Sequence, residues 1–351
     1  ILKAEILSAV DPDASDQVVR AWEEIAEGLD PDAFEELFSH IRTIHGQRRP
    51  QIIAGMRATI AATGGASAFL ETVFKPLAAA YREILQAPTG ASQLPAAVRQ
   101  PMIYLARLNG REWVPAAMVA IGRYRDDPAQ LAEILNEIDR FAHVMRILCL
   151  GSGKRVTRFA PVIIALQAGA PIAEICRFDR EDQKTIAYHL RDLHSRAAQI
   201  CKLVLLRLDD RLTGRQLITD PADWSIEHVL PKRPSPTSPW RTIFPDPRER
   251  EAATQSLGNL LLVSPLQNEL AKNQPFDRKQ QVFREALPEH RLALMSDVLS
   301  ASEWTPASVD QRKRKFFSLL DEMWSLALDS ATRAVVAESE APPSAPRRTR
   351  R

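Results

Sequence analysis

One short stretch of the chain places a carboxylate beside an imidazole. Glu227 and His228 lie in the run Trp-Ser-Ile-Glu-His-Val-Leu-Pro at 224–231. A neutral imidazole can take a proton from water near neutral pH, and a carboxylate can hold a cation. Two carboxamides follow, Asn259 directly after Gly258 and Asn268 further on. These four side chains could activate a water and hold one hard cation against a phosphate.

Local patterns indicate the elements that would position these residues. The short apolar run ending at His228 predicts a strand, and Leu-Leu-Leu-Val at 260–263 predicts a second one. Ser264-Pro265 predicts the start of a helix that carries Asn268. Between the strands, the proline-rich residues 231–248 predict an extended surface loop. The expected order is therefore strand, loop, strand, helix.

These motifs resemble those of a known nuclease family. The resemblance rests on Glu-His-Val-Leu-Pro at 227–231, Leu-Gly-Asn-Leu-Leu-Leu-Val at 257–263, Asn268, Asn-Gln-Pro-Phe at 273–276 and Lys279. Together they look like the HNH (His-Me finger, ββα-metal) nuclease domain that ends the GmrSD and SspE type of modification-dependent restriction enzymes. The resemblance covers roughly residues 215–330. It implies a metal-dependent DNA endonuclease that acts in bacterial defence against foreign DNA, including phage.

The resemblance also assigns a role to each site residue. His228 would be the general base that takes a proton from the attacking water, and Asn259 would orient its ring through its carboxamide or its backbone carbonyl. Glu227 and Asn268 would hold one Mg²⁺ or Mn²⁺. Because adjacent strand residues face opposite sides, Glu227 and His228 share a site only with a bulge or twist, and Asp223 is the alternative carboxylate. The residues implied to meet the DNA backbone are Lys272, Asn273 and Lys279.

Each of these residues also has a plainer interpretation. Gly258-Asn259 is compatible with an ordinary turn, and the polar residues after position 271 with a solvated helix face. Gly151-Ser152-Gly153-Lys154 does not complete a phosphate-binding loop, since Leu148 stands where the first glycine belongs. The remaining histidines show no metal-ligand spacing; they are His40, His45, His143, His189, His194 and His290.

The first 210 residues predict helices almost throughout, starting with an Asp30 cap and Pro31 at the first helical position, and no strand is expected before residue 215. Further helices are expected over 68–85, 96–108, 128–150 and 180–208, and after the nuclease motif over 276–286, 292–299 and 306–328. A weaker resemblance at 1–7 and 34–42 is to the helical segment that follows a ParB-like NTPase domain. That NTPase domain, which the sequence lacks, would be a partner within a longer protein.

We therefore expect a mainly α fold: a helical coupling or scaffold domain at 1–214, an HNH-type nuclease domain at 215–330 and a disordered basic tail at 331–351. The net charge of +2 requires any DNA binding to come from local basic surface. The three cysteines, which form no CxxC pair, predict buried reduced thiols and exclude a zinc-stapled HNH domain. The sequence contains neither a membrane-spanning run nor a signal peptide, so we expect the bacterial cytoplasm and no membrane partner.

Two other functions fit the same sequence. One is a noncatalytic helical interaction module in which the nuclease motif is only structural. The other is a ribonuclease that uses the same residues on RNA. A nicking assay on DNA and RNA separates these alternatives.

Overall fold

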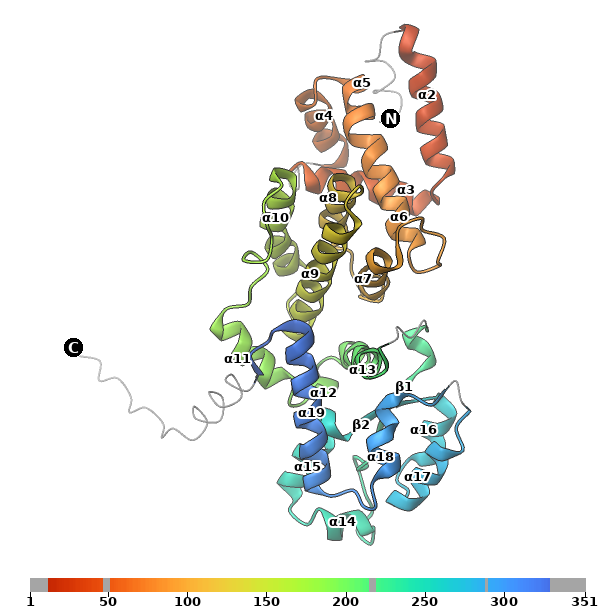
Figure 1. Ribbon diagram of the computed structural model, residues 1–351, viewed down its shortest axis with the longest axis vertical. Helices are drawn as coiled ribbons and strands as arrows, with labels where there is room; N and C mark the ends of the chain where they lie inside the picture. Colours follow the sequence, from red (N-terminus) through yellow and green to blue (C-terminus); the bar gives the residue numbers. More distant parts are fainter. Residues whose placement is uncertain (1–11, 47–50, 215–218, 288–289, 329–351) are drawn as a thin grey trace, which may run out of the picture. The chain divides into compact units, whose positions relative to one another are not determined.

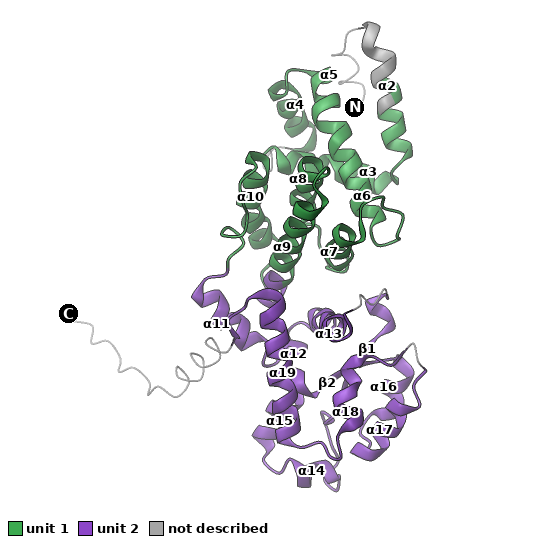
Figure 2. Cartoon of the chain, viewed as in Figure 1, with its two compact units in different colours: residues 1–143, 150–177 green, residues 144–149, 178–351 purple. Residues whose placement is uncertain are grey.

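The computed structural model describes residues 12–46, 51–214, 219–287 and 290–328. The chain forms two compact units, residues 1–143 with 150–177 and residues 144–149 with 178–351 (Figure 2). Within the described residues both units are built from helices, and one two-stranded sheet lies in the second unit (Figure 1). This confirms the predicted mainly α fold. The predicted basic tail at 331–351 and the motif at 1–7 lie outside the described residues.

The first unit is a set of helices around an aromatic core. Asp30 caps its second helix by accepting a hydrogen bond from Ala33 N at 2.9 Å, which confirms the predicted start. Trp22 stacks on Phe38 and Phe74 at centroid distances of 5.6 and 5.1 Å. The elements that begin in this unit are α2 (Pro12–Glu27), α3 (Pro31–Ile44), α4 (Ile52–Ala62), α5 (Ala66–Phe69), the π-helical η1 (Leu70–Phe74), α6 (Lys75–Gln86), α7 (Ala96–Ala106), α8 (Val114–Tyr124), α9 (Pro128–Ile147) and α10 (Ser152–Ala168).

In the second unit, helices pack around a short antiparallel pair of strands (Figure 1). The strands β1 (Ser225–His228) and β2 (Leu260–Val263) pair residue for residue, with His228 opposite Leu260. The helix α16 (Pro265–Ala271) follows β2 after a Ser264 cap, so the predicted order of strand, loop, strand, helix is confirmed. The remaining elements are α11 (Arg180–His189), α12 (Leu193–Arg196), α13 (Ala198–Thr213), η2 (Pro221–Asp223), α14 (Pro239–Ile243), α15 (Pro247–Gln255), η3 (Leu257–Asn259), α17 (Phe276–Arg284), η5 (Ala293–Met295), α18 (Ser296–Ser300) and α19 (Pro306–Trp324).

Three local predictions were wrong. The segment 231–248 is not fully extended, because it contains α14, whose Trp240 is buried and donates from Nε1 to Gln274 O at 2.9 Å. The single helix expected over 180–208 is broken, because Ala197 leaves the helical region at φ −151°. Cys149 is exposed, since it lies in a left-handed turn (φ 55°) just after α9; Cys176 and Cys201 are buried as expected.

The two compact units divide between Arg177 and Phe178, earlier than the boundary at 214 that the sequence suggested. The reason is packing: α13 contacts β2, η5 and α19, so it belongs to the same core as the hairpin. The coupling and scaffold role of the N-terminal part stays a prediction. In the described part of the chain, no helix is long and apolar enough to cross a membrane.

Candidate active site

Asn259 holds the chain immediately after His228. Its backbone carbonyl accepts a hydrogen bond from Val229 N at 3.0 Å, and its side-chain Oδ1 accepts one from Leu230 N at 2.7 Å. Its Nδ2 donates back to Leu230 O at 3.0 Å. Because His228 is the last residue of β1, these bonds fix the point at which the chain leaves the strand.

The Asn259 side chain has no hydrogen-bonding capacity left for the imidazole. Oδ1 also accepts from Trp304 Nε1 at 3.1 Å, and Nδ2 also donates to Thr254 O at 3.1 Å. Two donated and two accepted bonds are what a carboxamide can make. Asn259 is fully buried and holds the backbone after His228. Its predicted role in orienting the ring stays a prediction, for which only the backbone carbonyl remains available.

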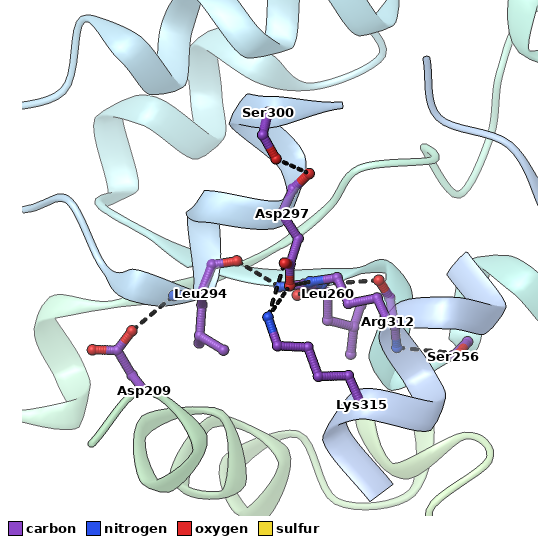
Figure 3. A network of polar contacts seen from close by, with 9 residues as sticks. Asp209, Ser256, Leu260, Leu294, Asp297, Ser300, Arg312 and Lys315 are labelled. Carbon is purple, nitrogen blue, oxygen red and sulfur yellow. Dashed lines mark hydrogen bonds and ion pairs between the residues drawn. The ribbon is translucent and has the colours of Figure 1, made fainter. Parts of the chain in front are cut away.

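Arg312 of α19 binds the backbone on both sides of Asn259, and Figure 3 shows it beside Leu260 and Leu294. The buried Arg312 guanidinium donates from Nη1 to the carbonyl oxygens of Gly258 and Leu260, both at 2.8 Å, and from Nη2 to Leu294 O at 2.8 Å. Burial lowers the Arg312 pKa to about 10, so the group remains charged at neutral pH. A Cβ at position 258 would collide with the Val309 carbonyl oxygen, which explains why glycine stands there.

Glu227 and Lys279 form a buried ion pair beside β1. The Lys279 ammonium, 0% exposed, contacts Glu227 Oε1 and donates to His228 O at 2.7 Å. Burial raises the pKa of Glu227 and lowers that of Lys279, and the charge of each partner opposes the shift of the other. The sequence suggested that Lys279 meets DNA, but here it faces the interior and ties α17 to β1.

The His228 ring lies on a different side of the strand from this ion pair. The one-to-one register of β1 with β2 contains no bulge, so Glu227 and His228 alternate in direction. The ring meets the His194 ring edge to face, with centroids 4.9 Å apart. The residue is 7% exposed, and its Nε2 is buried without a hydrogen-bond partner. Burial has the largest effect on the pKa of His228, and the charges of Lys232, His194 and Lys279 lower it further, to about 3. The ring is therefore neutral at physiological pH.

His194 is the neighbour that sequence reasoning missed. It lies on α12, which Ser195 anchors by donating from Oγ to Gln255 Oε1 of α15 at 2.6 Å. The exposed Lys232 brings its Nζ to 3.4 Å from His194 Nδ1. No spacing in the sequence links His194 to His228, because the two lie on separate elements; Lys232, in contrast, follows His228 by only four positions.

The other predicted residues lie around this centre. Asn268 is half-buried on α16, which packs against β1. Asp223 is exposed and borders a cavity of about 950 Å³ beside Trp224 and Gln267. Lys272 and Asn273 are exposed after α16. Lys272 pairs with Glu269 at 3.2 Å and has a positive φ of 28°.

The candidate ligands offer oxygen donors, the type of atom that a hard divalent cation prefers. Among the described residues, no group of three or more His, Cys, Asp and Glu side chains could hold a metal. Glu227 and Asn268 offer one carboxylate and one carboxamide, and Mg²⁺ is commonly held by one or two protein oxygens with water and substrate phosphate completing its shell. The Lys279 ammonium already neutralises Glu227, so a cation there would share that carboxylate.

Part of the second unit matches a known family. Residues 179–319 match the model of the GmrSD restriction endonucleases, C-terminal domain. This segment belongs to that family. The match lies wholly within the second unit, and the description of the family supports a restriction-endonuclease-type nuclease role, which implies DNA as the substrate. No curated protein matches the chain.

Proposed function

We propose that the GmrSD C-terminal domain hydrolyses phosphodiester bonds in DNA through an HNH-type site with His228 as general base. The observation that carries the proposal is the buried, unpartnered Nε2 of His228 on a strand end that Asn259 clamps. A buried nitrogen without a protein partner costs free energy, and a catalytic role is one of the physical explanations for such a group, beside a bound water or ion. Family membership supplies the substrate class.

In the proposed mechanism His228 accepts a proton from the water that attacks phosphorus. The ring is neutral in the free protein, as a base must be, and the approach of a phosphate anion raises its pKa toward the working pH. Asn259 and Arg312 keep the ring in place by fixing the backbone just after β1 and at the start of β2. Lys279 positions β1 through Glu227 and the His228 carbonyl, in place of the DNA contact suggested by the sequence.

A cation, Mg²⁺ or Mn²⁺, would be held by Asn268 and one carboxylate. Glu227 fills this role only by leaving Lys279 and turning toward the His228 side of β1; otherwise Asp223 is the carboxylate ligand. When bound, it would stabilise the charge that develops on the phosphate and on the leaving 3′ oxygen. Lys272 and Asn273, exposed just beyond α16, would contact the DNA backbone. The wider assignment is defence against foreign DNA, in the bacterial cytoplasm, with an NTPase domain of the same protein as partner.

The deciding experiment is a nicking assay on supercoiled plasmid with the full chain. His228→Ala should lower the rate a hundredfold or more, as expected for the loss of a positioned base, while DNA binding persists. His189→Ala is the matched control, a half-buried histidine of α11 in the same unit, whose Nδ1 contacts Ile147 O at 2.8 Å. Cleavage by His228→Ala at the wild-type rate would remove the base assignment, and cleavage of RNA but not DNA would make the domain a ribonuclease.

A metal titration tests the ligands separately. Nicking should require added Mg²⁺ or Mn²⁺, stop in EDTA, and be lost in Asn268→Ala at any Mg²⁺ concentration. An inactive Asn268→Ala beside a fully active Glu227→Ala would move the carboxylate ligand to Asp223. Full activity in EDTA would end the cation proposal.

A further inference from the structure

The side of His228 that faces α12 carries a second set of polar groups without an assigned role. His194 meets the His228 ring at 4.9 Å, and Lys232 Nζ lies 3.4 Å from His194 Nδ1. Lys232 is exposed and His194 is half-buried, so both are open to a ligand that would approach the buried Nε2 of His228.

The charges here select an anion over a cation. The ammonium of Lys232 lies 3.4 Å from His194 Nδ1, and the His194 ring meets the His228 ring at 4.9 Å, so a positive charge borders this pair of imidazoles. The carboxylate closest to His194 in the sequence, Asp192, is paired with Arg196 at 2.5 Å, and Glu227, next to His228, is paired with Lys279. A metal ion would be repelled by Lys232, whereas a phosphate would be attracted to it.

The contact with Lys232 favours one tautomer of His194. A lysine ammonium can only donate, so in this 3.4 Å contact His194 Nδ1 is the acceptor and carries no proton. The proton of the neutral ring then lies on Nε2, and His194 presents an N–H donor. Lys232 has two further N–H groups to offer.

From this geometry we propose that His194 and Lys232 form a phosphate-binding arm that holds the backbone of the DNA substrate against His228. His194 donates from Nε2 to a non-bridging phosphate oxygen, and Lys232 both holds the ring of His194 in this tautomer and contributes charge. The proposal rests on the nuclease function above and names two positioning residues for it.

Binding and cleavage are measured separately, so the proposal and the nuclease function can fail independently. Binding is followed by fluorescence anisotropy of a labelled duplex oligonucleotide in EDTA, and cleavage by plasmid nicking in Mg²⁺. His194→Ala should weaken binding about tenfold, the loss expected for one hydrogen bond to a charged group, and should slow cleavage at least as much. His194→Gln, which retains an N–H donor, should recover most of both.

Lys232→Ala should also weaken binding, and should reduce the slope of log affinity against log salt by about 1, as expected for one lost phosphate contact. Lys313→Ala is the matched control, a surface lysine of the same unit paired only with Asp310. Histidine ¹⁵N spectra should show His194 protonated at Nε2 and not at Nδ1.

Wild-type binding by both His194→Ala and Lys232→Ala would overturn the proposal, as would an Nδ1-protonated His194. Equal losses in His194→Ala and His194→Gln would also overturn it, because a structural role would not distinguish them. A wild type that binds DNA but never cleaves would refute the nuclease function while leaving the arm to be judged by binding alone.

Discussion

The two sides of the His228 strand end differ in how completely their polar groups are paired. On the interior side, Asn259 uses all of its hydrogen-bonding capacity and Arg312 donates to three carbonyl oxygens. On the other side, the His228 ring meets His194 of α12, its buried Nε2 has no partner, and Lys232 is exposed. The interior side is built like a protein core, whereas the open side has groups free for a ligand.

We infer that the interior side of this strand pair contributes mainly to stability and the open side mainly to function. A satisfied buried network rigidifies the backbone and costs much when broken. Unpaired groups at the mouth of a site lower stability and are retained for what they bind. Substitutions on the interior side should therefore unfold or loosen the domain, while those on the open side should change activity at nearly constant stability.

Arg312→Met should have the largest effect. It leaves the carbonyls of Gly258, Leu260 and Leu294 without their buried donor, and the expected loss is about 3–5 kcal/mol in the free energy of unfolding. Chemical denaturation followed by tryptophan fluorescence measures it. Lys315→Met is the control from the same network, a half-exposed residue that contacts Asp297 at 2.9 Å and should cost under about 0.5 kcal/mol. Equal losses in the two variants would contradict the buried clamp.

The contrast also explains what the sequence could and could not predict. Both strands and α16 follow from local signals: the apolar runs, the Gly258-Asn259 turn and the Ser264-Pro265 start. The helix from 276 looks like a solvated one, and nothing local reveals that Lys279 is buried, since its partner Glu227 is 52 positions away. The contact of His194 with His228 could not be predicted for the same reason. Secondary structure can be predicted from neighbouring residues, whereas contacts between residues far apart in the sequence cannot.

Lys279→Met should cost slightly less, about 3 kcal/mol, because it leaves the Glu227 carboxylate buried without its cation. Adding Glu227→Gln should recover most of this loss, since an uncharged pair no longer needs compensation. A double-mutant cycle in denaturant measures the coupling. If the double variant were as unstable as the sum of the single ones, the two groups would not interact in solution.

Asn259→Ala should cost about 2–3 kcal/mol, because Leu230 N and the Trp304 indole lose a buried acceptor and two carbonyls lose a donor. Its local effect is more specific. Hydrogen exchange at the amides of Val229 and Leu230 should accelerate more than exchange elsewhere in the hairpin. Asn273→Ala, an exposed carboxamide, is the control and should leave both quantities unchanged. Unchanged exchange at Leu230 in Asn259→Ala would show that another contact holds the strand end.

Lys232→Ala should have the smallest effect on folding, under about 0.5 kcal/mol, because an exposed lysine that donates one long bond at 3.4 Å contributes little to stability. Its effect on DNA should still be clear, since the lost charge lies beside both imidazoles of the site. The same denaturation and binding measurements made on this variant and on Arg312→Met should give opposite patterns. Substantial unfolding in Lys232→Ala would mean that the open side is also a structural network, and the separation of stability from function within the hairpin would then be lost.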